Sequence, residues 1–152
     1  MPFPRQLRDE MDTLLRDTPL LKTLGIELVA WLPGSAALKM TPTPDHGNLN
    51  GTLHGGVLFS LADAAFEIAC NSYGRLAVAL ETSCHYCRPA KIGEPITAGA
   101  SEVTRSRHTA SYRVDVRDGK GDLLAWYMCL AFRTEQWHLG EDRWPSKWRK
   151  SH

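Results

Sequence analysis

Long hydrophobic stretches are missing from this sequence. The longest uninterrupted apolar run, residues 123–132, has 10 residues, and a helix needs about 20 to cross a bilayer. The first residues, MPFPRQLRDEMD, also lack the apolar segment of a signal peptide. We therefore expect a cytoplasmic protein with no membrane partner.

An excess of charge of either sign is also absent. The 18 Lys and Arg residues nearly balance the 17 Asp and Glu residues, which gives a net charge of +1 with neutral histidines. No overall field then attracts the chain to nucleic acid, so any anionic ligand must be held by local cations. The length of 152 residues and the hydrophobic content of 43% instead favour one folded domain with one core.

Cysteine is scarce, with four residues in the chain, too few for a disulfide framework at this length. Cys84 and Cys87 form a CxxC motif, which is typical of redox and zinc sites. They fall within a predicted strand, however, where side chains three positions apart point to opposite faces. No second CxxC or pair of histidines completes a zinc site. We expect ordinary packed thiols and no bound metal.

The first 53 residues predict a short helix, a hairpin and a loop. Apolar residues between 7 and 15 recur at helical spacing, and Thr18-Pro19 should end that helix. The apolar runs 26–32 and 36–40 flank Pro-Gly-Ser, a hairpin signal. Residues 41–53 hold two prolines, two glycines and two asparagines, which indicates a long loop of the kind that often carries function.

Residues 55–72 predict a helix that is buried nearly all round. They contain no proline and are mostly apolar. The polar residues Ser60, Asp63, Glu67 and Asn71 are spaced so that they fall in one stripe roughly 80° wide. Two carboxylates therefore share a narrow stripe of a core helix.

The sequence after Gly74 predicts strands at 76–88, 95–106, 109–117 and 122–133, arranged as a four-stranded meander with a turn at 118–121. An antiparallel sheet wrapped around one long buried helix is the economical way to bury such a helix. We therefore predict an α+β fold of this kind with a short N-terminal helix. Residues 1–134 form the single domain.

Residues 135–152 form a basic, tryptophan-rich C-terminal tail, with Trp137, Trp144 and Trp148 among arginines and lysines. Aromatic residues interleaved with basic ones can bind single-stranded nucleic acid. The alternative is that the tryptophans dock on the body of the protein or on a neighbouring subunit. No nucleic-acid-binding motif occurs elsewhere, so we favour docking.

The start of the long helix carries a potential site for an oxyanion. Gly55 and Gly56 remove side chains at the place where free backbone N–H groups point outward, with the positive end of the helix dipole behind them. Asp63 lies about 12 Å farther along the helix and cannot reach its own helix start. A two-fold dimer would bring the partner's Asp63 opposite this Gly55. The alternative is a structural role for Asp63, in a hydrogen bond or an ion pair, for example with His85 or Arg88.

These residues resemble a known family. The segment from Asn48 to Gly74, with HGGVLFSLADAAFEIACNSYG at its centre, is similar to the hotdog-fold acyl-CoA thioesterases, especially the phenylacetate-degradation subfamily. The residues from Tyr86 to Glu94, YCRPAKIGE, and the order of strands add to the resemblance. It implies hydrolysis of a CoA thioester at a site shared across a dimer interface, often within a tetramer of two such dimers. Coenzyme A is then part of the substrate, and no other cofactor is implied.

The resemblance implies specific roles for four residues. Gly55 matches the residue whose N–H polarises the thioester carbonyl, and Asp63 matches the general base or nucleophile from the other subunit. Asn48 matches the residue that orients the reacting groups, and His54 one near the thioester sulfur. The resemblance to the phenylacetate-degradation subfamily also suggests an aryl or arylacetyl thioester as substrate.

The substrate-binding residues are less sharply indicated. This chain has Glu67 and Ala79 where some members of the family carry Ser or Thr, which leaves the position of the water open. Gly56 and Phe66 lie beside the predicted site, and the CoA phosphates need local cations. Candidates for these cations near strand ends are Arg88, Lys91, Arg105 and Arg107. The alternative functions are a non-catalytic acyl-CoA sensor and a hotdog dehydratase that acts on 3-hydroxyacyl thioesters.

Overall fold

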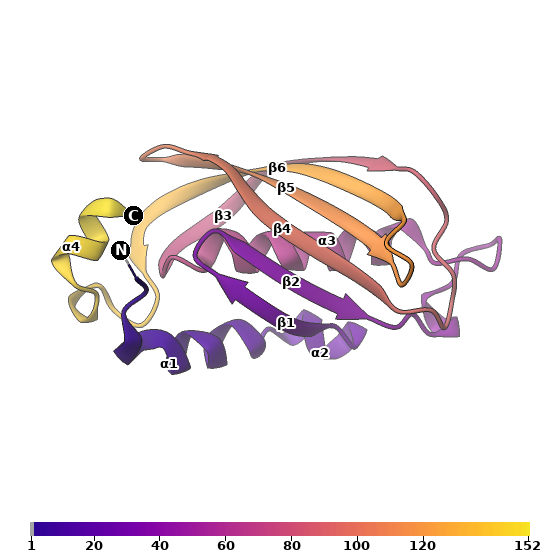
Figure 1. The fold of residues 1–152 in the computed structure, drawn as a ribbon, viewed down its shortest axis with the longest axis horizontal. Helices are drawn as coiled ribbons and strands as arrows, with labels where there is room; N and C mark the ends of the chain where they lie inside the picture. Colours follow the sequence, from indigo (N-terminus) through magenta and orange to yellow (C-terminus); the bar gives the residue numbers. More distant parts are fainter. Residues whose placement is uncertain (1) are drawn as a thin grey trace.

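The computed structural model describes residues 2–152 as a curved sheet around one long helix (Figure 1). The elements in chain order are α1 (Arg5–Arg16), α2 (Pro19–Leu24), β1 (Glu27–Leu32), β2 (Ser35–Met40), the 3-10 turn η1 (Pro44–His46), α3 (Gly55–Asn71), β3 (Arg75–Tyr86), β4 (Ile96–Arg105), β5 (Thr109–Asp118), β6 (Leu123–Trp137), the 3-10 turn η2 (Glu141–Arg143) and α4 (Ser146–Ser151). Among residues 2–152, no helix has both the length and the apolar character needed to cross a bilayer.

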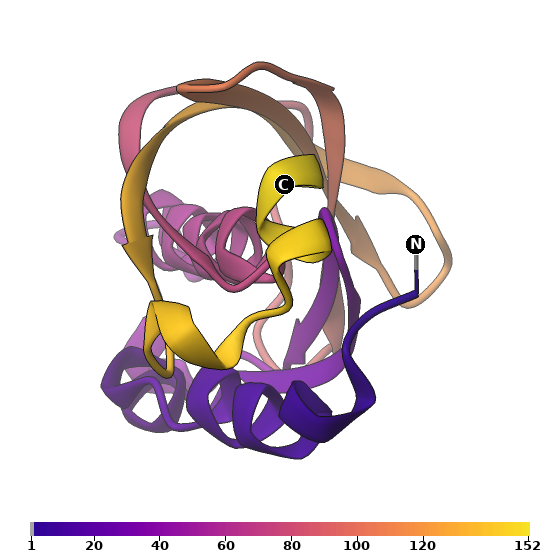
Figure 2. The same cartoon turned by 90° about the vertical axis from the view of Figure 1, so that its left-hand side faces the viewer.

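The six strands form one antiparallel sheet in the order β1-β2-β4-β5-β6-β3. Seen along α3, the sheet curls around the helix (Figure 2). The predicted α+β architecture is thereby confirmed. The four-stranded meander is wrong, because β3 pairs with β6 and not with β4. The connection from Cys87 to Pro95 carries the chain across to the other side of the β5–β6 hairpin, so β3 becomes an edge strand.

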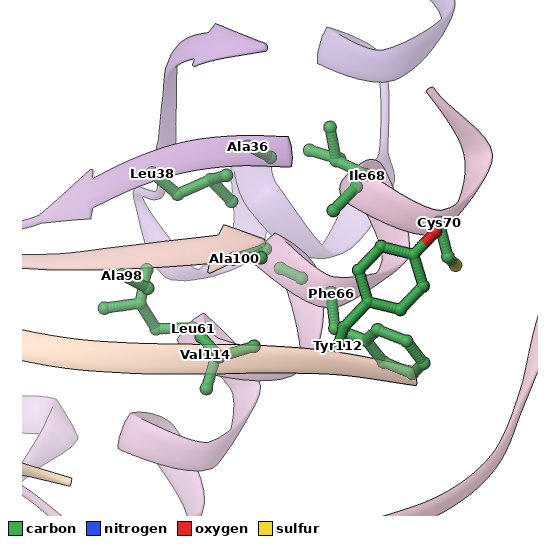
Figure 3. Close-up of a cluster of buried hydrophobic side chains, with 14 of the residues drawn as sticks. Ala36, Leu38, Leu61, Phe66, Ile68, Cys70, Ala98, Ala100, Tyr112 and Val114 are labelled. Carbon is green, nitrogen blue, oxygen red and sulfur yellow. The ribbon is translucent and has the colours of Figure 1, made fainter. Parts of the chain in front are cut away.

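Helix α3 packs against the inner face of the sheet through small and apolar side chains. Leu61 and Phe66 are 0% and 1% exposed. The ring of Phe66 packs against the ring of Tyr112 from β5, with the two ring centroids 5.5 Å apart. Figure 3 shows these rings beside Ile68 and Cys70 of α3, with Leu38 of β2 and Val114 of β5 in the same cluster. Alanines on α3 and on β2, β4 and β6 let the helix lie close to the strands, because they add little volume between the layers.

Helix α1 lies along the free edge of β1, where Arg8 and Arg16 donate to the carbonyl oxygens of Trp31 and Leu28. Leu7, Met11 and Leu15 bury one face of α1, and the indole of Trp31 on β1 donates to Asp12 across 2.9 Å. The prediction that the first helix ends near Pro19 holds, but Pro19 then begins α2. Proline is favoured at the first position of a helix because the missing N–H is not needed there.

The C-terminal segment belongs to the same hydrophobic core. Strand β6 continues to Trp137, beyond the expected domain boundary at residue 134. Trp144 and Trp148 are 2% and 0% exposed, and the indole of Trp148 donates to the backbone oxygen of Tyr73 across 2.9 Å. Figure 2 shows this segment across one end of the curled sheet. These two buried indoles offer no face for stacking on nucleic-acid bases, which contradicts the nucleic-acid alternative.

Candidate functional site

The start of α3 leaves one backbone donor without an acceptor. His54 caps the helix: its Nδ1 accepts from the N–H of Gly56 at 2.9 Å. The His54 carbonyl oxygen accepts from Val57 and Leu58 at 3.0 and 3.2 Å. The N–H of Gly55 has no hydrogen-bond acceptor among residues 2–152. This single free donor at the positive end of the helix dipole can stabilise negative charge on a ligand oxygen.

Tyr86 fixes the position of this helix start. Its hydroxyl donates to the carbonyl oxygen of Gly55 across 3.0 Å. A Cβ atom at position 55 would lie 3.3 Å from the Tyr86 ring, so glycine allows this close approach. The sequence indicated Tyr86 only as the first residue of the segment YCRPAKIGE and gave no sign of this contact, which joins residues 31 positions apart.

Asn48 holds the loop that leads into α3. Its amide nitrogen donates to Thr52 Oγ1 at 2.9 Å and to the Leu53 carbonyl oxygen at 3.3 Å. Its amide oxygen accepts from the backbone N–H groups of Asn50 and Thr52. Asn48 lines the same surface hollow as Gly55, together with Tyr86 and Arg88. The structure therefore brings Asn48 beside the free donor and uses its side chain to shape the loop.

Asp63 is a half-buried carboxylate without a hydrogen bond or an ion pair among residues 2–152. Burial raises the pKa of its carboxyl above the ordinary value. The expected structural partners lie elsewhere: Arg88 pairs with Asp122 at 3.0 Å, and His85 stacks on Trp126. Within one chain, Asp63 therefore forms no ion pair with His85 or Arg88.

Glu67 lies one helical turn after Asp63 on the same stripe. Packing around its carboxylate raises its pKa, and the nearby charge of Asp63 raises the pKa further, although the residue as a whole is exposed in the single chain. The other two residues of the stripe are engaged. Ser60 donates to the Gly56 carbonyl oxygen, and Asn71 donates to the backbone oxygens of Glu67 and Ala77. The stripe thus presents two carboxylates that have no partner in the described chain.

The remaining candidates are spread over the molecule. Phe66 is a core residue, 1% exposed, and Ala79 is exposed on β3. Arg105 stacks over Tyr73 at 4.2 Å, at the end of α3 opposite to Gly55, and Arg107 is exposed in the β4–β5 turn. The helix is 17 residues long, so these two arginines lie about 25 Å from the free donor. Of the basic candidates, Arg88 lines the hollow at Gly55.

The described residues form no cluster of three or more His, Cys, Asp or Glu side chains that could hold a metal ion. Cys84 lies within β3, Cys87 follows the end of that strand, and both are free thiols. The chemistry available at the site is therefore a backbone donor, carboxylates, an imidazole and an arginine.

The sequence of the chain is similar to those of known proteins. Residues 50–125 match the model of the thioesterase superfamily. A putative esterase of Archaeoglobus fulgidus is 34% identical over 82% of this chain and 81% of its own length. The acyl-coenzyme A thioesterase PaaI of Escherichia coli is 39% identical over 62% of this chain and 68% of its own length.

The fold of the chain is also similar to those of solved structures. The E. coli PaaI protein from the phenylacetic acid degradation operon superposes with a TM-score of 0.84 at 29% identity, over 90% of this chain and 99% of that one. A hypothetical thioesterase protein of Streptococcus pneumoniae solved with coenzyme A superposes with a TM-score of 0.70 at 25% identity, over 73% of this chain and 90% of that one.

Proposed function

Since the chain belongs to the thioesterase superfamily, we propose that it hydrolyses aryl or arylacetyl thioesters of coenzyme A at a site shared between two copies of the chain. Water adds to the thioester carbonyl, the carbon–sulfur bond breaks, and the products are a free acid and coenzyme A. The observation that carries the proposal is that α3 presents two groups with no partner among residues 2–152. One is the backbone N–H of Gly55, and the other is the carboxylate of Asp63.

Gly55 stabilises the charge that develops during the reaction. Attack on the carbonyl carbon moves negative charge to the carbonyl oxygen, and the free N–H at the start of α3 donates to that oxygen. One such donor contributes on the order of 3 kcal/mol to lowering the barrier. Tyr86 holds the Gly55 carbonyl, so the donor needs no reorganisation when the charge appears.

Asp63 is the general base or nucleophile. Burial keeps its carboxylate poorly solvated, and none of the described cations forms an ion pair with it. The carboxylate therefore remains available to a water molecule or to the carbonyl carbon of the thioester. A positioned carboxylate base contributes about 10² to 10⁴ in rate. Because Asp63 and Gly55 of one chain lie about 12 Å apart along the helix, each site takes the two groups from different chains.

The free edge of β3 supports such a dimer. Leu80 on this strand is 56% exposed, which is unusual for an apolar residue in mid-strand. Antiparallel pairing of two β3 edges about a two-fold axis sets the first half of one strand beside the second half of the other. The partner's Tyr86, and with it the partner's Gly55, then approaches the Asp63 of this chain.

His54 and Arg88 complete the site. His54 Nδ1 accepts from Gly56, so in the neutral imidazole the proton is on Nε2, where it can donate to the departing sulfur. Arg88 is exposed beside the same hollow and is placed to attract a CoA phosphate. Asn48 keeps the loop in the shape that exposes the Gly55 N–H.

The proposal is tested by incubating the pure protein with phenylacetyl-CoA, benzoyl-CoA and medium-chain acyl-CoAs and titrating the released thiol. We expect thiol release, with the highest kcat/KM for the aryl thioesters, in keeping with the name of the E. coli relative from the phenylacetic acid degradation operon. A preference for straight aliphatic chains would overturn the aryl assignment. Hydration of an enoyl thioester without thiol release would indicate a dehydratase, and binding alone would indicate a sensor.

A further inference from the structure

A second cavity lies along α3, on the side away from Gly55. It has a volume of about 300 Å³ and is walled by the end of α1, the second half of α3 and the first residues of β3. Its apolar walls come from Leu14, Leu15, Ile68, Leu76 and Val78. The volume is at the lower end of the range for small-molecule sites, so a ligand inside it must be compact.

The exposure of Leu14 is unusual on its helix. Leu7, Met11 and Leu15 of α1 are all buried, whereas Leu14 is 40% exposed and faces this cavity. Val78 on β3 is similarly exposed. These two side chains present apolar surface from opposite walls, which favours an apolar occupant.

Glu67 lies at the rim of this cavity and is about 6 Å along the helix from Asp63. A thioester held at Asp63 can therefore place its acyl group in the cavity. Glu67 and Asp63 together carry two negative charges at this entrance, and no described cation pairs with either of them. An acyl group that ends in a carboxylate would meet repulsion there.

The far wall of the cavity is neutral. His138, which follows β6, lines it together with Asn71. Asn71 uses its amide nitrogen as donor to Glu67 and Ala77, so its amide oxygen accepts from His138 Nε2 across 2.8 Å. This contact places a proton on Nε2 of His138, and burial lowers the pKa of that imidazole, which favours its neutral form. The described residues that line the cavity include no lysine or arginine to bind a carboxylate.

We propose that this cavity receives the acyl group of the thioester, that it selects compact, uncharged apolar acyl groups of about the size of a phenyl ring or a six-carbon chain, and that Leu14 and Glu67 determine this selectivity. Leu14 limits the size of the acyl group, and Glu67 rejects acyl groups with a terminal carboxylate. The inference rests on the proposed hydrolysis and adds the site and the chemistry of the acyl group.

The test uses thioethers of CoA, which bind but cannot be hydrolysed. Calorimetry gives the Kd of S-(2-phenylethyl)-CoA relative to S-methyl-CoA. We expect Leu14→Trp, which fills the cavity, to reduce this preference by at least about tenfold, since burial of a phenyl ring contributes that much or more to affinity. Leu20→Trp on α2 is the control, because Leu20 is also exposed, at 43%, and lies outside the cavity. The control should keep the preference within about twofold.

The second arm uses Glu67→Gln, a change of shape too small to disturb folding. S-(4-carboxybutyl)-CoA should bind this variant about tenfold more tightly than it binds the unmodified protein, while S-(2-phenylethyl)-CoA binds both equally. An unchanged preference in Leu14→Trp, or no gain in Glu67→Gln, would overturn the assignment. Thiol release from phenylacetyl-CoA by the unmodified protein is measured separately. Its absence would contradict the proposed hydrolysis, and the thioether affinities would still decide where the acyl group binds.

Discussion

The hydroxyl of Tyr86 donates a hydrogen bond to the carbonyl oxygen of Gly55 across 3.0 Å, so the last residue of β3 holds the first residue of α3. The edge strand that we propose as the dimer interface is thereby connected to the donor that we propose for catalysis. Docking of a second copy on β3 can therefore influence the alignment of the Gly55 N–H.

Tyr86→Phe removes this hydrogen bond and keeps the ring. A neutral hydrogen bond contributes about 1 kcal/mol, so we expect kcat to fall by roughly 3- to 10-fold. KM and the melting temperature should change little, because Tyr86 is 52% exposed. Steady-state kinetics and a thermal melt on the same sample check this. A kcat equal to that of the unmodified protein would show that the contact does not position Gly55.

Gly55→Val tests the free donor itself. The added side chain would press against the Tyr86 ring, which lies 3.3 Å from the Cβ position, and would occupy the approach to the N–H. We expect kcat/KM to fall by at least about 10². Gly99→Val is the matched control, because Gly99 is an exposed strand glycine with no atom within 4 Å of its Cβ position. Loss of melting temperature without loss of hydrolysis in Gly55→Val would assign the glycine to packing alone.

Asp63→Asn separates activity from stability. Hydrolysis should fall by at least about 10². Because burial raises the pKa of Asp63 in the folded state, the folded protein binds the proton more tightly than the unfolded chain, and ionisation of Asp63 costs stability as the pH rises through the raised pKa. The variant should therefore be more stable than the unmodified protein at pH 7, and this difference should vanish as the pH falls below the ordinary value of 3.8.

Urea unfolding at several pH values between about 3 and 8 measures this difference. A variant that is less stable than the unmodified protein at pH 7 would mean that Asp63 has a favourable partner in the assembled protein, and would restore its structural interpretation.

Gly74→Ala tests how the C-terminal segment is docked. Gly74 has φ of +87°, and a Cβ there would lie 2.0 Å from the Trp144 ring. Gly121 has φ of +89° but no atom within 4 Å of its Cβ position. Alanine at position 121 should cost about 1 kcal/mol of unfolding free energy for backbone strain. Alanine at position 74 should cost roughly 1 to 3 kcal/mol more for overpacking, and equal costs would contradict the close contact with Trp144.

The parts of the fold that depend on local patterns were predicted from the sequence. The burial of α3 follows from its nearly continuous apolar residues, and the β5–β6 turn follows from Asp118 to Gly121. The place of β3 beside β6 could not be read from the sequence, because strand order depends on which edges the other hairpins leave free. The short helix α2 was missed because Pro19 was read as an end and not as a beginning.

The candidate site divides in the same way. His54, Gly55 and Asp63 lie on one continuous segment, and the resemblance of this segment to the hotdog thioesterases implies their roles. Tyr86 and His138 come from distant strands and meet α3 only after folding, so no local signal identifies their contacts. Phe66 was expected beside the site from the family resemblance, but its side chain is 1% exposed and packs against Tyr112 in the core.

The central claim is that each site combines Gly55 of one chain with Asp63 of another. The most direct measurement mixes the two inactive variants Gly55→Val and Asp63→Asn in equal amounts, after reversible dissociation, and follows thiol release. Statistical mixing makes half of the dimers mixed, and each mixed dimer contains one intact site. We therefore predict recovery of about one quarter of the unmodified activity. A mixture as inactive as the two separate variants, with mixed dimers demonstrated by mass spectrometry, would contradict the shared site.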